Sequence, residues 1–253
     1  MPNEVITNST VSVASQTLNN QLNLSDIIQV VIAFITLCAV LVALFKERFW
    51  RNKDKPIIDV YFSDKDTECY QRTDMHVTLN NGTVIAIPTY YIRMIVSNIG
   101  KDTLNNAEVV LEKVEPQSEM FMSLNLDWAG FIPLNLNDIT RTVRIPQGQS
   151  RVVNVIEVMR PDKAMKLSKM MKSIKSVDYQ RYEGYIKGFR ACSIKPNSLS
   201  DIFTAGEYVF HLGIYADNTE PKYVKLSIKY SGKWGKRDGK DMQTKYLKVK
   251  LLE

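Results

Sequence analysis

The sequence has few of the residues that usually build metal centres and disulfide frameworks. It contains two histidines, His76 and His211, and three scattered cysteines, Cys38, Cys69 and Cys192. Two histidines so far apart do not give the ligand spacing of a zinc site. Three dispersed cysteines give no disulfide framework and fit a reducing compartment. We therefore expect neither a bound metal ion nor structural disulfides.

The common catalytic motifs are missing too. The sequence has no G-x-S-x-G elbow, no glycine-rich phosphate loop, no H-E-x-x-H and no set of kinase motifs. The acidic run Asp64, Asp66 and Glu68 alternates as calcium ligands do, but it lacks the spacing and the glycine of an EF-hand loop. A solvated turn is the favoured interpretation of this run. We predict a protein that is not an enzyme and binds no cofactor.

Charge is missing from one long stretch. Residues 27–45, IIQVVIAFITLCAVLVALF, are nineteen consecutive residues without a charge. As an α-helix they would measure about 28 Å, close to the roughly 30 Å of a bilayer's hydrocarbon core. A cleaved signal peptide would need a basic segment before it, and residues 1–26 contain no Lys or Arg. A buried helix of a soluble domain would normally show a polar face. The prediction is a transmembrane helix over residues 25–46.

The two flanks of this stretch differ in charge. Residues 46–55, KERFWRNKDK, carry a net charge of +3. Residues 1–26, before the apolar stretch, have only acidic residues among their charged side chains. By the positive-inside rule the N-terminal tail, residues 1–24, lies outside, and the part of the chain that follows the helix lies in the cytoplasm. Residues 47–56 are a basic juxtamembrane linker that can touch anionic headgroups of the bilayer. The membrane-flanking residues of this prediction are Lys46, Arg48, Trp50, Arg51, Lys53 and Lys55.

Beyond Pro56 the apolar residues recur with the period of two that is typical of half-buried strands. Seven or eight strands at this spacing predict a mainly β domain over residues 57–253, an immunoglobulin-like antiparallel β-sandwich. The strands near residues 90–97 and 107–114 could form either a hairpin or an arch between two sheets. The predicted strands are 58–62, 84–88, 90–97, 107–114, 151–158, 207–216, 224–230 and 247–251.

Two segments interrupt the strands. Residues 115–149 contain Pro116, Pro133 and Pro146 and predict an irregular surface excursion pinned by aromatic residues. A helical insertion follows over about 161–178, opened by a proline in its first turn. Its predicted buried face consists of Leu167, Met170, Met171, Ile174 and Val177. Its lysines recur every third residue and fan around the helix, which favours a solvated surface over a single stripe for lipid or nucleic acid.

Two strings resemble known strand patterns. YYIRMIVSNIGKDTLNNAEVVLEKV resembles the V-x-N-x-G strand pair of bacterial and archaeal immunoglobulin-like domains, and AGEYVFHLGIYADN resembles their G-x-Y strand. The order of the apolar span, the basic stretch and these strands is similar to a group of uncharacterised prokaryotic single-pass membrane proteins. The resemblance implies a fold and a membrane location, and it implies no active-site residues.

The loop SGKWGKRDGK places a tryptophan among cations. Lys233, Trp234, Lys236 and Arg237 could bind a partner through cation–π contacts, or the tryptophan could simply pack on its own sheet.

Two function classes follow from this sequence. The first is a non-enzymatic module that binds an unidentified protein partner at the cytoplasmic membrane face. The alternative is an enzyme or ligand sensor with a site built from residues 115–149 and 163–200. The modest net charge of +6 is spread along the chain, so we expect no nucleic-acid binding.

Overall fold

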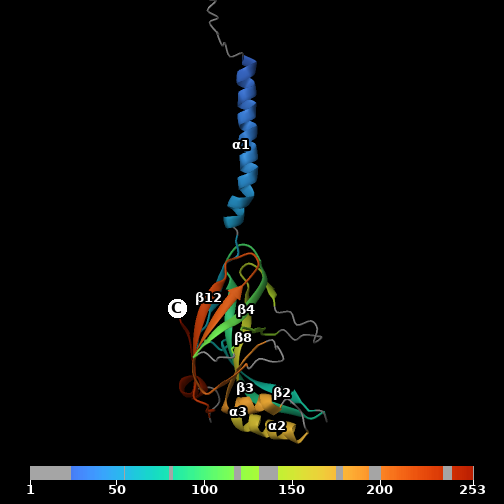
Figure 1. Cartoon of the computed structure of the whole chain (residues 1–253), viewed down its shortest axis with the longest axis vertical. Coiled ribbons are helices and arrows are strands. Elements are labelled where there is room, and N and C mark those ends of the chain that lie inside the picture. Colours follow the sequence, from blue (N-terminus) through green and yellow to red (C-terminus); the bar gives the residue numbers. More distant parts are fainter. Residues whose placement is uncertain are drawn as a thin grey trace, which may run out of the picture. The chain divides into compact units, whose positions relative to one another are not determined.

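The computed structural model describes residues 24–53, 55–79, 82–116, 121–130, 142–174, 179–193, 201–235 and 241–252, without the side chains of 46–53, 179–181 and 187. The predicted tail, apart from Leu24, therefore lies outside the described residues. The chain divides into two compact units, Met1–Asn52 and Lys53–Glu253. It is mainly β, with two antiparallel sheets and one N-terminal apolar helix (Figure 1).

The N-terminal helix α1 (Leu24–Lys53) contains the apolar stretch found in the sequence. Its residues Leu24–Phe45 are long and apolar enough to cross a membrane, and none of them is buried in the protein. A signal sequence can have the same length and composition. The helix continues to Lys53, so most of the predicted linker 47–56 is helical. The physical reason is that residues 46–53 contain good helix formers, and the first proline after them is Pro56.

The larger sheet of the second unit has seven strands, all paired antiparallel. Its main order is β1-β3-β8-β9-β10; β2 also pairs with β3, and β6 also pairs with β8. The long strand β3 is the centre of this sheet, because three other strands pair with it. The strands are β1 (Ile58–Tyr61), β2 (Tyr70–Thr78), β3 (Val84–Asn98), β6 (Asp127–Trp128), β8 (Ser150–Met159), β9 (Gly188–Ala191) and β10 (Ile202–Thr204).

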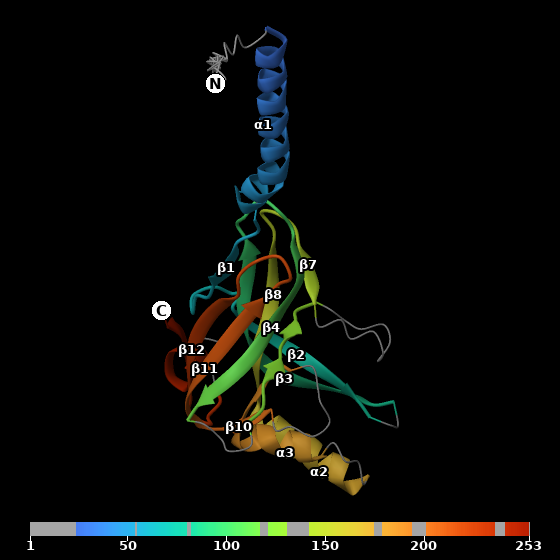
Figure 2. The same cartoon turned by 45° about the horizontal axis from the view of Figure 1, so that its top comes forward.

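The smaller sheet has six strands in the order β13-β12-β11-β4-β5, and β7 also pairs with β4. A short π-helical turn, η1 (Met242–Tyr246), leads into the last strand. Both sheets are visible in Figure 2, where β4, β11 and β12 lie together. The strands are β4 (Leu104–Glu115), β5 (Leu124–Asn125), β7 (Val143–Ile145), β11 (Gly206–Tyr215), β12 (Lys222–Tyr230) and β13 (Leu247–Leu252).

The connection from β3 to β4 is an arch between the sheets, which resolves the alternative left open by the sequence. Asn98 is buried at its start, and its side-chain amide donates to the carbonyl oxygens of Asp102 at 2.7 Å and Ile145 at 2.9 Å. Gly100 lies so close to the backbone that an added Cβ would come within 2.4 Å of the Ile57 nitrogen. The N-x-G part of the resemblance therefore has a structural cause in this arch.

A shared apolar core fills the space between the two sheets. β3 contributes Tyr90, Ile92, Met94 and Val96, while Phe210 and Leu212 come from β11. Trp128 on β6 also belongs to it. We call the face of the seven-stranded sheet that borders this core its inner face, and the opposite face its outer face. The alternating pattern of these strands is the one that the sequence predicts.

Two helices cover one end of the outer face, whereas the sequence predicts one helical insertion. They are α2 (Pro161–Ser173) and α3 (Tyr179–Lys187), and they lie beside the end of the sheet at which β2 leads into β3 (Figure 1). The second core under them includes Ile87, Leu167, Met171 and Tyr185.

The predicted buried face of α2 is correct at Leu167 and Met171 and wrong at Ile174. Ile174 is 47% exposed, because α2 ends at Ser173 and its buried stripe is Ala164, Leu167, Ser168 and Met171. Val177 lies outside the described residues. The lysines at 163, 166, 169 and 172 are exposed, as the prediction of a solvated surface requires.

Candidate functional site

A β-bulge in β8 gives the outer face an unusual set of polar residues. Arg93 of β3 pairs with Asn154, but the residue before Arg93 pairs with Ile156, so Val155 is an extra residue in β8. In a regular strand Asn154 and Glu157 would point to opposite faces, because their separation is odd. The extra residue brings both side chains to the outer face. Bulges often redirect side chains in this way beside functional sites.

As a result, two rows of polar residues cross the outer face. Neighbouring strands are about 4.8 Å apart, so each row of three residues spans about 10 Å between its outer Cα atoms. The first row, on β3, β8 and β9, is Tyr91, Glu157 and Arg190. The second row, on β3, β8 and β6, is Arg93, Asn154 and Asp127.

The first row belongs to a closed network of buried charges. Nη1 of Arg190 lies 3.0 Å from Oε1 of Glu157, and both side chains are almost fully buried. Nε of Arg190 donates to Asp201, and the hydroxyl of Tyr185 donates to Glu157. Tyr185 also belongs to the second core. The network therefore joins α3 to β8 and β9, and it neutralises the buried guanidinium.

The second row is not neutralised in this way. Nε of Arg93 donates to Oδ1 of Asn154 at 2.8 Å, and its guanidinium carbon lies 5.5 Å from the ring centre of Tyr91. Within the described ranges, no carboxylate forms an ion pair with Arg93. The backbone nitrogen of Asp127 donates to the carbonyl oxygen of Cys192 at 2.9 Å. Its carboxyl group has no hydrogen-bond partner among the residues that the structure describes.

The pKa shifts of the charged residues differ between the two rows. Burial lowers the pKa of the Arg93 guanidinium, and burial raises the pKa of the Asp127 carboxyl against the opposing effect of Arg190. Burial also raises the pKa of Tyr91, and the nearby charge of Glu157 adds to that effect. For Arg190, burial opposes the charged form, but the groups of its network outweigh burial and raise its pKa. The charge of Arg190 is thus compensated, while Arg93 and Asp127 bear the cost of burial.

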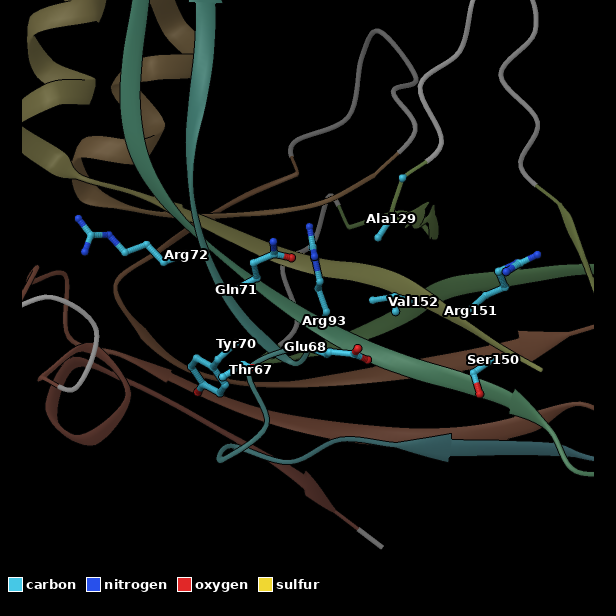
Figure 3. A pocket seen from close by; sticks show the side chains of 11 residues that line it. Thr67, Glu68, Tyr70, Gln71, Arg72, Arg93, Ala129, Ser150, Arg151 and Val152 are labelled. Atoms are coloured by element: carbon cyan, nitrogen blue, oxygen red, sulfur yellow. The ribbon is translucent and has the colours of Figure 1, made fainter. Parts of the chain in front are cut away.

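Both rows line a cavity of about 400 Å³. A second hollow of about 890 Å³ adjoins it, and Arg93 lines both, together with Gln71 and Val152 in the larger one. Figure 3 shows the side chain of Arg93 rising from its strand between those of Gln71 and Ala129. Volumes of this size are typical of sites for small molecules.

The chemistry of the cavity is that of charge recognition. Burial raises the pKa of the Cys192 thiol well above its usual value, so this cysteine stays protonated and is a poor nucleophile. No group of three His, Cys, Asp or Glu side chains that could hold a metal ion occurs in the described parts of the chain. The acidic run near Asp66 forms a turn in which the backbone nitrogen of Glu68 donates to Oδ1 of Asp66 at 2.8 Å. The groups left to hold a ligand are the guanidinium of Arg93 and the carboxyl of Asp127, neither of which forms an ion pair with a described residue.

The predicted partner-binding cluster lies elsewhere, after β12. Trp234 is half-buried and packs against the shared core, with its ring centre 5.0 Å from that of Tyr90. This contact favours the packing interpretation of the tryptophan. Lys233 is exposed, and Lys236 and Arg237 lie outside the described residues. A partner-binding role for this cluster stays a prediction.

Of the predicted membrane-flanking residues, the structure describes only one side chain. Lys55 is exposed. The side chains of Lys46, Arg48, Trp50, Arg51 and Lys53 lie outside the described residues, although their backbone is helical. The role of this flank in setting orientation therefore also stays a prediction.

The sequence did not single out the residues of the cavity. The alternative site over 115–149 and 163–200 includes the positions of Asp127, Arg190 and Cys192, but it names none of them. The sequence predicts Arg93 and Glu157 only as members of strands. The available signal was weak: Arg93 is a large charged residue on the outer side of an alternating strand, and this is common on solvated surfaces.

No family model matches the chain, and neither a curated protein nor a solved structure matches it.

Proposed function

We propose that this protein is a membrane-anchored, non-enzymatic interaction module that presents its β domain at the cytoplasmic membrane face. The observation that carries the proposal is the exposure of α1 along the whole of Leu24–Phe45. A core helix would bury an apolar stripe in its own domain, and this helix buries none. Lipid is the environment in which a helix of this length and composition is stable.

The charge of the flanks supports the orientation. The basic residues after the helix, among them Lys46, Arg48 and Arg51, would stay in the cytoplasm, and the tail without Lys or Arg would cross the membrane. The β domain then lies on the same side as the basic flank. It is tied to the bilayer, which is its first partner.

The order of the strands supports an immunoglobulin-like domain. The three strands β1-β3-β8 correspond to A-B-E of that fold, and β4-β11-β12 correspond to C-F-G. The arch between β3 and β4 then corresponds to the B–C crossing from one sheet to the other. Domains of this kind place binding functions in loops on a rigid sandwich, which fits a protein partner.

Two experiments test this proposal. A reporter fused after Glu253 is expected to be active only in its cytoplasmic form, and neutralising Lys46, Arg48, Arg51, Lys53 and Lys55 should weaken that preference. Affinity purification of the tagged protein from solubilised membranes should recover one stoichiometric protein partner. A signal on the outer side from the unmodified fusion would refute the orientation. Recovery of the protein without any partner would refute the interaction module.

A second candidate function is a ligand sensor. The specific observation that favours it is the cavity of about 400 Å³, in which Arg93 and Asp127 are half-buried and form no ion pair with a described residue. Such groups reduce the stability of a protein, and they are typical of sites that bind or react.

A further inference from the structure

Arg93 and Asp127 lie at the two ends of one row, with Asn154 between them. Both line the cavity of about 400 Å³, and they carry opposite charges, positive on Arg93 and negative on Asp127. We infer that this cavity binds a small zwitterion, a molecule with an anionic group and a protonated amine, as in an α-amino acid. The inference rests on the second candidate function, the ligand sensor, and names the chemical class of its ligand.

Arg93 is oriented for the anionic group. A guanidinium has five N–H donors in a planar fork, and the hydrogen bond from Nε to Asn154 uses one of them. The ring of Tyr91 lies under the same guanidinium and restricts it further. The two terminal nitrogens remain for a carboxylate, which they can bind through two parallel hydrogen bonds. A group that is already oriented loses little conformational entropy when the ligand arrives.

Asp127 is placed for the ammonium group. Its Cα lies about 10 Å from that of Arg93 across β8, and the two side chains shorten the gap over the cavity. One small molecule can fill the remaining distance with a charged hydrogen bond of about 2.8 Å at each end. An ammonium beside Asp127 would give the half-buried carboxyl an ion pair, which it lacks among the described residues.

The neighbouring charges argue against a ligand of a single sign. A pure anion would satisfy Arg93, but it would approach Asp127 and Glu157 in the same cavity. A pure cation would approach Arg93 and Arg190. A zwitterion avoids both repulsions. The adjoining hollow of about 890 Å³, which meets the cavity at Arg93, gives space for the rest of the molecule (Figure 3).

The test uses the full-length protein in detergent micelles and isothermal titration calorimetry. The probes are the twenty common α-amino acids, each with a matched carboxylic acid that lacks the amine and a matched amine that lacks the carboxylate. We expect at least one amino acid to bind, and its two matched compounds to bind about 10- to 100-fold more weakly, because each loses one charged contact.

Variants then assign the contacts. Arg93→Gln and Asp127→Asn should each weaken the amino acid by about 10- to 100-fold, while the exposed controls Arg144→Gln and Asp74→Asn leave its Kd unchanged. The melting temperature of each unliganded variant shows that it is folded. If a matched acid or amine binds as tightly as the amino acid, the zwitterion inference fails and the ligand sensor survives. If no probe of any class binds, both fail. Binding that Arg93→Gln and Asp127→Asn leave unchanged would place the ligand elsewhere and overturn the inference.

Discussion

The two faces of β3 carry opposite kinds of residue. On the inner face Ile92, Met94 and Val96 are completely buried in the shared core. On the outer face the alternate residues Tyr91 and Arg93 lie half-buried over a cavity. The inner face gains stability from burial of apolar surface, whereas the outer face contains charges whose burial lowers stability.

Within the outer face the two polar rows differ as well. The row of Arg190 has its charges paired and hydrogen-bonded, and it connects α3 to the sheet. The row of Arg93 and Asp127 has no such compensation in the described part of the chain. Stability explains the apolar core and the row of Arg190, which we call the paired row. It does not explain the row of Arg93 and Asp127, which we call the unpaired row because its charges form no ion pair with a described residue.

The largest expected effect belongs to the paired row. Arg190→Met would leave Glu157 and Asp201 buried without their cation, and this should lower the free energy of unfolding by about 3–5 kcal/mol. The measurement is denaturant unfolding of the full-length protein in micelles, followed by tryptophan fluorescence. Arg160→Met is the matched control, because its pair with Asp162 is exposed and should contribute no more than about 1 kcal/mol. Equal effects of the two variants would show that the buried network is not structural.

The inner face should respond through loss of packing. Ile92→Ala removes a completely buried side chain from the shared core and should cost about 3 kcal/mol. Val84→Ala, on an exposed position of the same strand, should cost no more than about 0.5 kcal/mol. Both values come from the same unfolding measurement. A cost below about 1 kcal/mol at Ile92 would contradict a tightly packed core.

The apolar side of this comparison could be predicted from the sequence. The alternation in 207–216, 224–230 and 247–251 gives the inward faces of β11, β12 and β13, because a strand with one buried face repeats every two residues. Tyr208, Val224 and Leu251 on these faces are only half-buried, but they still pack against the shared core. In β8 the bulge breaks the alternation, and its last five residues are all buried. One periodic pattern is enough where a single face is buried.

Other elements could not be predicted, for identifiable reasons. The sequence of β2 (Tyr70–Thr78) predicts only a polar stretch, because its outer side carries Gln71 and Thr73 next to the cavity. The sequence predicts separate strands over 84–88 and 90–97, on either side of a break at Pro88, but β3 runs through this proline. The short strands β5, β6 and β7 are too brief for periodicity within the predicted excursion 115–149. In each case tertiary pairing overrides the local signal.

The candidate site could not be predicted from the sequence, because it depends on the bulge in β8. Without the extra residue at Val155, Asn154 and Glu157 would lie on opposite faces, and neither row would form. The site also joins strands that are far apart in the chain, from Tyr91 to Arg190. Such a juxtaposition has no local sequence pattern.

A smaller effect is expected at the tryptophan of the predicted partner-binding cluster. Trp234→Ala should cost about 2 kcal/mol, less than the 3–5 kcal/mol typical of a fully buried ring, because Trp234 is only half-buried against Tyr90. Lys233→Ser should change stability by no more than about 0.5 kcal/mol. Thermal unfolding of both variants, with co-purification as a second readout, checks this prediction. An unchanged melting temperature for Trp234→Ala together with a lost partner would favour the binding interpretation.

The smallest expected change in the free energy of unfolding is an increase, whereas the other variants lower it or leave it nearly unchanged. It concerns Asp127 of the unpaired row. Burial raises the pKa of Asp127 above its value in the unfolded chain, so its ionised form lowers stability. The penalty is absent at low pH, where the carboxyl is protonated in both states, and it develops as pH rises through the folded pKa. Asp127→Asn should therefore raise the free energy of unfolding at pH 7, by less than the loss at Ile92, and leave it nearly unchanged near pH 3. The exposed Asp74→Asn should show no such pH dependence. A loss of stability at pH 7 in Asp127→Asn would mean that the carboxylate has a structural partner, and Asp127 would then belong with the paired row.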